Sequence, residues 1–134
     1  MAVEQAEPEA GLIKLLKKVR TLLKKDGKLF LVTENRMAVR YFCGDKDPFT
    51  GRNFDGIENY KRVSAFDNKR LAGRLYSKAE LTGILEQAGF PYHRFYSVFP
   101  DITSPQILFA EDYTPDEELD IRMFPQYHSP DTVF

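Results

Sequence analysis

Hydrophobic positions in the first part of the chain recur at steps of three and four residues. From about Glu9 they fall on one face of a helix whose other face carries lysines: Leu12, Ile13, Leu15, Leu16, Val19, Leu22 and Leu23. This periodicity predicts an amphipathic helix with one face packed inward. A second apolar stripe, in "YSKAELTGILEQAGF" (residues 76–90), predicts another helix that ends at Gly89.

The apolar run "KLFLVT" shows no alternation of apolar and polar positions. A short run of this kind is typical of a strand that is buried on both faces, as in a parallel sheet, so we predict a buried strand at Lys28–Thr33. Two further strands are expected at Tyr92–Phe99 and Gln106–Ala110. They must be antiparallel, because the connection "PDITSP" between them is too short for a crossover.

Residues 34–75 have little periodicity but are rich in glycines and aromatic rings. A loop this long inside a compact domain is usually functional or disordered, and the aromatic content argues against disorder. Within it we expect a short helix from about Arg36 to Phe42. The order of elements predicts an α/β domain at residues 9–113, between a disordered N-terminus at residues 1–8 and an acidic, proline-rich tail or linker at residues 114–134.

Composition narrows the function classes. The 134 residues suit one domain, and the net charge of −1 gives no reason to expect nucleic acid or an anionic membrane as a partner. The single cysteine, Cys43, excludes an intramolecular disulfide and is interpreted as a small buried side chain. His93 and His128 have no second ligand nearby, so no metal site is expected. No apolar run approaches the roughly 20 residues that span a bilayer, and we expect a cytoplasmic protein.

Four stretches carry a resemblance to a known family: "LLKKDGKLFLVTENRMAVRYFCG", "FTGRNFDGIENY", "YSKAELTGILEQAGF" and "RFYSVFPD". From about Leu12 to Tyr113 the chain resembles the C-terminal half of a Rossmann-like, SAM-dependent methyltransferase. Within that superfamily it looks like the bacterial methyltransferase domains linked to cell-surface polysaccharide or lipopolysaccharide glycosyltransferases. The resemblance implies a partial Rossmann-like methyltransferase sheet of about three strands, with the last strand antiparallel. It also implies a glycosyltransferase domain as a possible partner.

The cofactor half of such an enzyme is missing from this sequence. In the family a glycine-rich turn after the first strand lets the backbone approach SAM, and no such glycine cluster follows a strand here. The chain is therefore interpreted as an excised domain, a truncated gene or a subunit whose SAM-binding half comes from another chain. Alone, it is expected to bind no cofactor and to be inactive.

The residues that follow the predicted strand are the first candidates for a site. Ligands in open α/β sheets bind beyond the carboxyl ends of the strands, so the segment after Thr33 would face the crevice. Glu34 could serve as a catalytic base or contact an acceptor hydroxyl, and it could equally cap a helix or pair with Arg36. Asn35 and Arg36 could bind a sugar hydroxyl or a phosphate, with a structural salt bridge as the alternative for Arg36.

The loop supplies the remaining candidates for substrate binding. Tyr41, Phe42 and Tyr60 could stack on a sugar ring or pack beneath the loop. Asp55, with Gly56 beside it, could contact substrate or simply form a turn.

Two other function classes compete with the methyltransferase. A non-catalytic interaction module could associate through an exposed strand edge, including with a second copy of the chain, because unpaired edges recruit other strands. Nucleic-acid binding through the lysine-rich helix is the weakest alternative, because the net charge is close to zero.

Overall fold

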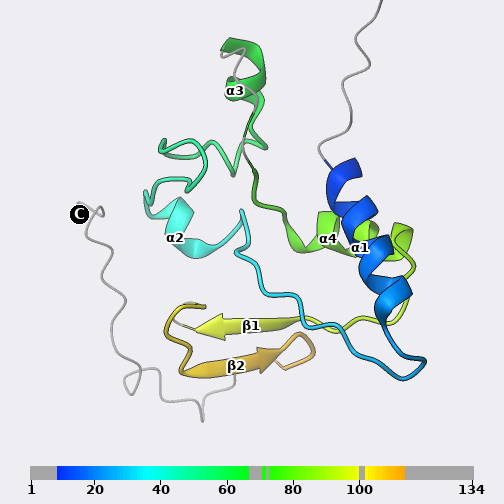
Figure 1. Ribbon diagram of the computed structural model, residues 1–134. Coiled ribbons are helices and arrows are strands. Elements are labelled where there is room, and N and C mark those ends of the chain that lie inside the picture. The colour runs from blue at the N-terminus through cyan, green and yellow to red at the C-terminus, as the bar shows by residue number, and fades with distance from the viewer. Residues whose placement is uncertain (1–8, 67–70, 72, 100–101, 114–134) are drawn as a thin grey trace, which may run out of the picture. The chain divides into compact units, whose positions relative to one another are not determined.

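The computed structural model describes residues 9–66, 71, 73–99 and 102–113, so the predicted disordered N-terminus and acidic tail lie outside the described residues. In this part the chain is mixed α/β, with four helices and a two-stranded antiparallel sheet (Figure 1). It forms two compact units. Unit 1 holds the described residues up to Leu31 together with Lys78–His93, and unit 2 holds Val32–Ser77 and the described residues from Arg94 onward.

Unit 1 consists of the two helices that the periodicity predicts. Helix α1 spans Ala10–Leu22 and packs against α4, which spans Lys78–Gln87 (Figure 1). The most deeply buried side chains of this pair are Leu16, Leu81, Ile84 and Leu85, and Ala88, in the turn after α4, is buried as well. The apolar stripe of α1 is buried only in part, since Leu22 is 77% exposed.

The end of α4 depends on a glycine, as the sequence predicts. Gly89 has a φ of +88°, in the left-handed region that closes many helices. A Cβ atom at this position would also lie 3.0 Å from the Arg20 Cδ atom, and the Arg20 guanidinium lies over the Phe90 ring, 5.6 Å from its centroid. Glycine at position 89 therefore allows the left-handed turn and leaves room for the Arg20 side chain, which joins α1 to the segment after α4.

The segment Lys28–Thr33 differs most from the prediction. It forms no strand, and its side chains are largely exposed: Phe30 is 87%, Leu31 44% and Val32 69% accessible. The prediction of a buried strand is therefore wrong, and the described residues hold two strands rather than about three. An apolar sequence favours burial, but a strand also needs partners for its N–H and C=O groups, and within the described residues no backbone hydrogen bond joins this segment to another.

The predicted antiparallel pair is confirmed as a hairpin, with shorter strands than expected. Strand β1 spans Tyr96–Phe99 and β2 spans Ile107–Ala110, with Tyr96 opposite Ala110. Just beyond the open end, the Arg94 Nη2 atom donates to Asp112 Oδ1 at 2.6 Å, and this bond lowers the pKa of the Asp112 carboxyl. An isolated two-stranded hairpin is only marginally stable in water.

Two short helices lie in the long loop. Helix α2 spans only Val39–Phe42, a part of the helix expected from Arg36, because the Asn35 side-chain oxygen accepts the Met37 N–H at 2.9 Å and holds a turn there. Helix α3, at Lys61–Phe66, is not predicted by the sequence pattern.

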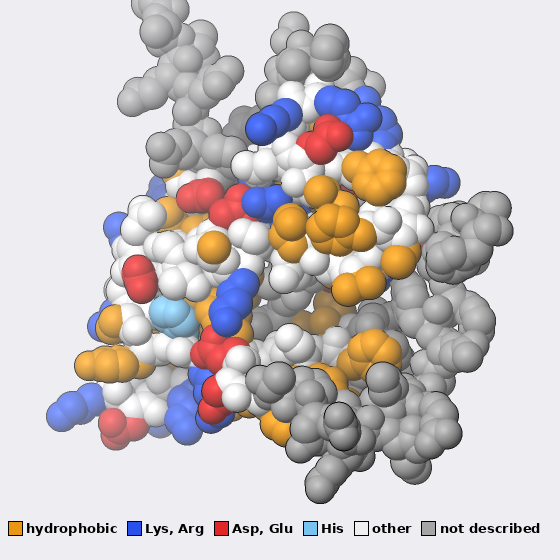
Figure 2. All heavy atoms as spheres, turned by 180° about the vertical axis from the view of Figure 1, so that it is seen from behind, with side chains coloured by type: hydrophobic (Ala, Val, Ile, Leu, Met, Phe, Trp, Pro, Cys, Tyr) orange, Lys and Arg blue, Asp and Glu red, His pale blue; other side chains and the backbone are white. Residues whose placement is uncertain are grey.

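Hydrophobic side chains reach the surface among charged ones on the face drawn in Figure 2. None of the helices in the described ranges is long and apolar enough to cross a membrane.

Candidate functional site

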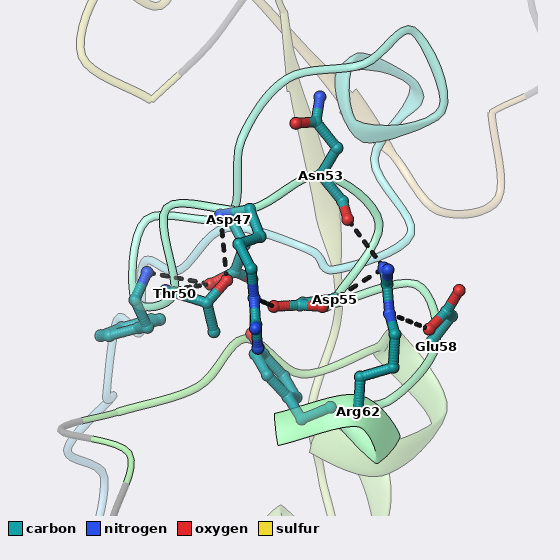
Figure 3. Close-up of polar contacts among 9 residues, drawn as sticks. Asp47, Thr50, Asn53, Asp55, Glu58 and Arg62 are labelled. Atoms are coloured by element: carbon teal, nitrogen blue, oxygen red, sulfur yellow. Dashed lines mark hydrogen bonds and ion pairs between the residues drawn. The ribbon is translucent and has the colours of Figure 1, made fainter. Parts of the chain in front are cut away.

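The long loop of unit 2 contains three buried carboxylates, Asp45, Asp47 and Asp55, and the last two belong to one network. Asp47 is 2% exposed and Asp55 is fully buried. Burying a charge is costly unless it is paired and hydrogen-bonded, so the partners of these two groups determine how the loop folds. We use the name carboxylate network for the two aspartates together with Arg52, Tyr60 and Arg62 (Figure 3).

Asp47 organises the turn that follows it. Its Oδ1 atom accepts the backbone N–H groups of Phe49 at 2.9 Å and Thr50 at 3.1 Å. Its Oδ2 atom accepts the Tyr60 hydroxyl at 2.8 Å. This is the turn that an aspartate makes with the backbone two and three residues ahead. One carboxylate thus fixes a local turn and ties it to a residue further along the chain.

Asp55 is balanced by two arginines that are themselves about half exposed. Arg52 donates from Nε to Asp55 Oδ2 at 2.8 Å, and Arg62 Nη2 lies 3.3 Å from Asp55 Oδ1. Figure 3 shows Arg62 between Asp55, the Glu58 carboxylate and the Asn53 carbonyl. The corresponding distances are 2.7 Å to Glu58 Oε2 and 3.0 Å to the Asn53 oxygen. The Asp55 carboxylate therefore forms ion pairs with two arginines and does not project toward solvent.

Tyr60 joins the network to the segment before α4. Its hydroxyl donates to Asp47 and accepts the backbone N–H of Leu75 at 2.8 Å. Its backbone has a φ of +59°, next to +57° at Asn59, a conformation that a bulky residue adopts only when its surroundings impose it. Burial raises the pKa of the Tyr60 hydroxyl well above its ordinary value, and the hydrogen bond to Asp47 acts in the same direction.

The stretch "FDGIENY" contains a glycine where the backbone passes close to other atoms, and Arg36 holds this part of the loop by hydrogen bonds. A Cβ atom on Gly56 would lie 3.0 Å from Asp47 Oδ2 and 3.5 Å from the Arg36 Cβ atom, so the backbone passes closely here. The Arg36 Nη1 atom donates to the Gly56 and Ile57 carbonyls at 3.3 and 3.2 Å. Through its Nη1 atom, Arg36 therefore holds this part of the loop.

Glu34, the predicted base, lies in a second cluster with Tyr41. The Tyr41 hydroxyl donates to Glu34 Oε2, while Glu34 Oε1 lies 4.0 Å from Arg40 Nη1. Arg40 is held in turn by Asp45, through an Nε to Oδ2 bond of 2.8 Å. Burial raises the pKa of the Tyr41 hydroxyl, and the Glu34 hydrogen bond adds to the rise. The Glu34 side chain is 31% exposed, so its carboxylate is fixed in position and still open to a ligand.

The other predicted site residues differ in how far they are exposed and in their contacts. Tyr41 and Tyr60 are buried, which agrees with the packing interpretation of these rings. Phe42 is 54% exposed and open to a ligand ring. Asn35 uses its side-chain oxygen within its own turn. Cys43 is exposed, so its interpretation as a buried side chain is wrong.

Sequence reasoning missed Asp47, Arg52 and Arg62, which hold much of the loop. A signal for Asp47 is present in "DPFT", because an aspartate followed by proline commonly begins a turn that its own carboxylate caps. The two arginines carry no comparable signal, since their positions depend on how the chain brings Asp55 to them. Within the ranges that the structure describes, no group of three potential ligand side chains could hold a metal ion.

The raised pKa values of Tyr41 and Tyr60 predict how stability depends on pH. An unfolded tyrosine ionises near pH 10, so their contribution is fully present below about pH 10 and is lost as the pH rises above it. We expect the free energy of unfolding, measured with urea from pH 8 to 11.5, to fall above pH 10. The Tyr41→Phe/Tyr60→Phe variant should show a smaller fall, and an equal fall in both proteins would contradict the assignment.

Comparisons with known proteins add no functional assignment. No family model, no curated protein and no solved structure matches the chain. Any functional conclusion must therefore come from the sequence and from the geometry described above.

Proposed function

We propose that the chain is the acceptor-side part of a SAM-dependent methyltransferase acting in cell-surface polysaccharide or lipopolysaccharide biosynthesis. The observation that carries the proposal is the exposed apolar segment Lys28–Thr33. Its composition is that of an interior strand, yet Phe30 and Val32 are open to solvent. A SAM-binding half outside this chain would supply the neighbouring strand. The proposal includes a cytoplasmic location and a glycosyltransferase domain as a possible partner.

The order of elements supports this interpretation. Helix α1 precedes the apolar segment, and Glu34 follows that segment directly. If the segment pairs as a sheet strand, Glu34 stands at its carboxyl end, where ligands of open α/β sheets bind. The bond from Tyr41 fixes one Glu34 oxygen, which is the preorganisation that a catalytic group requires.

In the proposed reaction, an acceptor hydroxyl attacks the methyl group that SAM supplies when it is bound by the complete enzyme. That methyl group is electrophilic, and the residues of this chain would hold the acceptor hydroxyl and take up its proton. Glu34 takes the proton from the acceptor hydroxyl. Tyr41 positions Glu34, while Phe42 offers an exposed ring to the acceptor.

Calorimetry with SAM tests the proposal. This chain alone should not bind SAM, whereas a longer chain that includes the upstream reading frame should bind one equivalent. In that longer protein, Glu34→Gln should leave the SAM affinity within about twofold and lower methyl transfer to purified lipopolysaccharide by about 10²–10⁴-fold. One-to-one SAM binding by this chain, or an upstream frame without a strand and glycine-rich turn, would contradict the proposal.

A non-catalytic interaction module is the second candidate. The same exposed segment favours it, because an unpaired apolar strand can recruit another strand without any chemistry.

A further inference from the structure

The segment Lys28–Glu34 carries exposed apolar side chains. Side chains at alternate positions of an extended chain point to opposite sides. Phe30 and Val32 are 87% and 69% exposed and Leu31 between them is 44% exposed; pairing as a strand would place Phe30 and Val32 on the same side. Phe30 and Val32 are therefore both available to a strand that pairs with this segment.

The backbone of this segment is open as well. The segment runs without a helix, turn or bend, and within the described part of the chain no backbone hydrogen bond joins Lys28–Thr33 to another segment. It also connects unit 1 to unit 2, a position where linkers are ordinarily polar. An apolar connection whose N–H and C=O groups make no backbone hydrogen bond within the described residues is suited to pairing with another strand.

The ends of the segment carry opposite charges in a self-complementary arrangement. If two copies align antiparallel about Leu31, Lys28 of one copy lies opposite Glu34 of the other. In the same alignment Phe30 lies opposite Val32, on the same side as the charged pair. An aromatic residue opposite a β-branched one and opposite charges across strands are both stabilising cross-strand pairs. Each of these pairs occurs twice, once on either side of the two-fold axis.

Other antiparallel alignments lose this match. A slide of two residues places Phe30 opposite Glu34 or Lys28 opposite Val32, which sets a charge against an apolar side chain. A register shift of one residue, in either direction, moves Phe30 of one copy so that it no longer faces Val32 of the other. Among antiparallel pairings with a second copy of the chain, the charge pattern therefore favours the register centred on Leu31.

We propose that this chain forms a two-fold symmetric dimer through antiparallel pairing of Lys28–Glu34, with Leu31 at the axis. The proposal develops the second candidate function and does not require methyl transfer. It uses the surface that the methyltransferase proposal assigns to the SAM-binding half. A longer protein that contains that half should therefore not dimerise through this segment.

Disulfide trapping tests the register. In a Cys43→Ser background, which removes the native exposed thiol, Leu31→Cys should give a disulfide-linked dimer under mild oxidation. Directly opposed residues have Cα atoms about 4.5–5.5 Å apart, which a disulfide can bridge. Leu29→Cys is the matched control on the same side of the strand. Its two copies would lie about 13 Å apart along the strands, too far for a bond.

Sedimentation equilibrium tests the charge pairing. Lys28→Glu sets two like-charged pairs across the interface and should weaken dimerisation by about tenfold. Lys25→Glu, at an exposed lysine outside the segment, makes the same charge change and should have less than about a twofold effect.

Efficient trapping at position 31 with little at position 29, together with the selective effect of Lys28→Glu, is the expected result. A protein that stays monomeric, equal trapping at both positions, or equal effects of the two lysine variants would each overturn the proposal. SAM binding by the longer protein is measured separately, so failure of the dimer and failure of the methyltransferase proposal are distinguishable.

Discussion

Replacing Asp47 with alanine should lower the free energy of unfolding of unit 2 by about 3–4 kcal/mol. The buried carboxylate accepts the Phe49 and Thr50 N–H groups and the Tyr60 hydroxyl. Alanine leaves all three donors without this acceptor, and a buried donor without a partner costs about 1–3 kcal/mol. Urea unfolding followed by circular dichroism measures the change.

The controls separate the hydrogen bonds from the charge. Asp47→Asn keeps the shape and an acceptor oxygen, so we expect a loss of about 1–2 kcal/mol. Asp26→Ala, at an exposed carboxylate, should change stability by less than about 0.5 kcal/mol. In a double-mutant cycle, Asp47→Ala and Tyr60→Phe should be non-additive because their side chains are bonded. A loss below about 1 kcal/mol for Asp47→Ala would show that the turn does not depend on this carboxylate.

The second large effect is expected in unit 1, where Ile84→Ala should cost about 3 kcal/mol. Ile84 is 1% exposed on α4, the helix that packs against α1. Truncating it removes buried methyl groups and leaves a cavity that a pair of helices cannot fully close. Leu22→Ala is the matched control, because Leu22 is 77% exposed and its loss should change stability by less than about 0.5 kcal/mol. Similar losses in the two variants would mean that α4 does not use Ile84 as its packing centre.

The helices of unit 1 could be predicted from the sequence because their apolar spacing is a local property. The stripe through Leu81, Ile84 and Leu85 identifies both the helix and its buried face. Gly89 marks the helix end, since few other residues tolerate its φ. The hairpin was predictable for a similar reason, because a short connection leaves only an antiparallel arrangement.

The segment Lys28–Thr33 could not be predicted in the same way. Its composition indicates burial in a sheet, but the state of a strand depends on residues elsewhere that pair with it. Within the described residues no backbone hydrogen bond joins Lys28–Thr33 to another segment, although Phe30 has the character of a buried strand residue.

The site was predictable only in part. Glu34 was singled out by its position after an apolar run and Tyr41 as an aromatic ring of the loop, and the structure brings them together. Asp55 and Tyr60 were also singled out, but they belong to a network that holds the loop rather than to an open surface. That network depends on tertiary contacts among separate parts of the loop, and no local pattern identifies both arginine partners of Asp55.

Amide hydrogen exchange at Leu29–Thr33 tests most directly whether this segment is a strand whose partner lies outside the chain. In the dilute monomer these amides should exchange rapidly, and in the longer protein that carries the upstream half they should be strongly protected. Slow exchange in the dilute monomer would mean that the segment is already paired within the chain. Fast exchange in the longer protein would mean that no strand joins it.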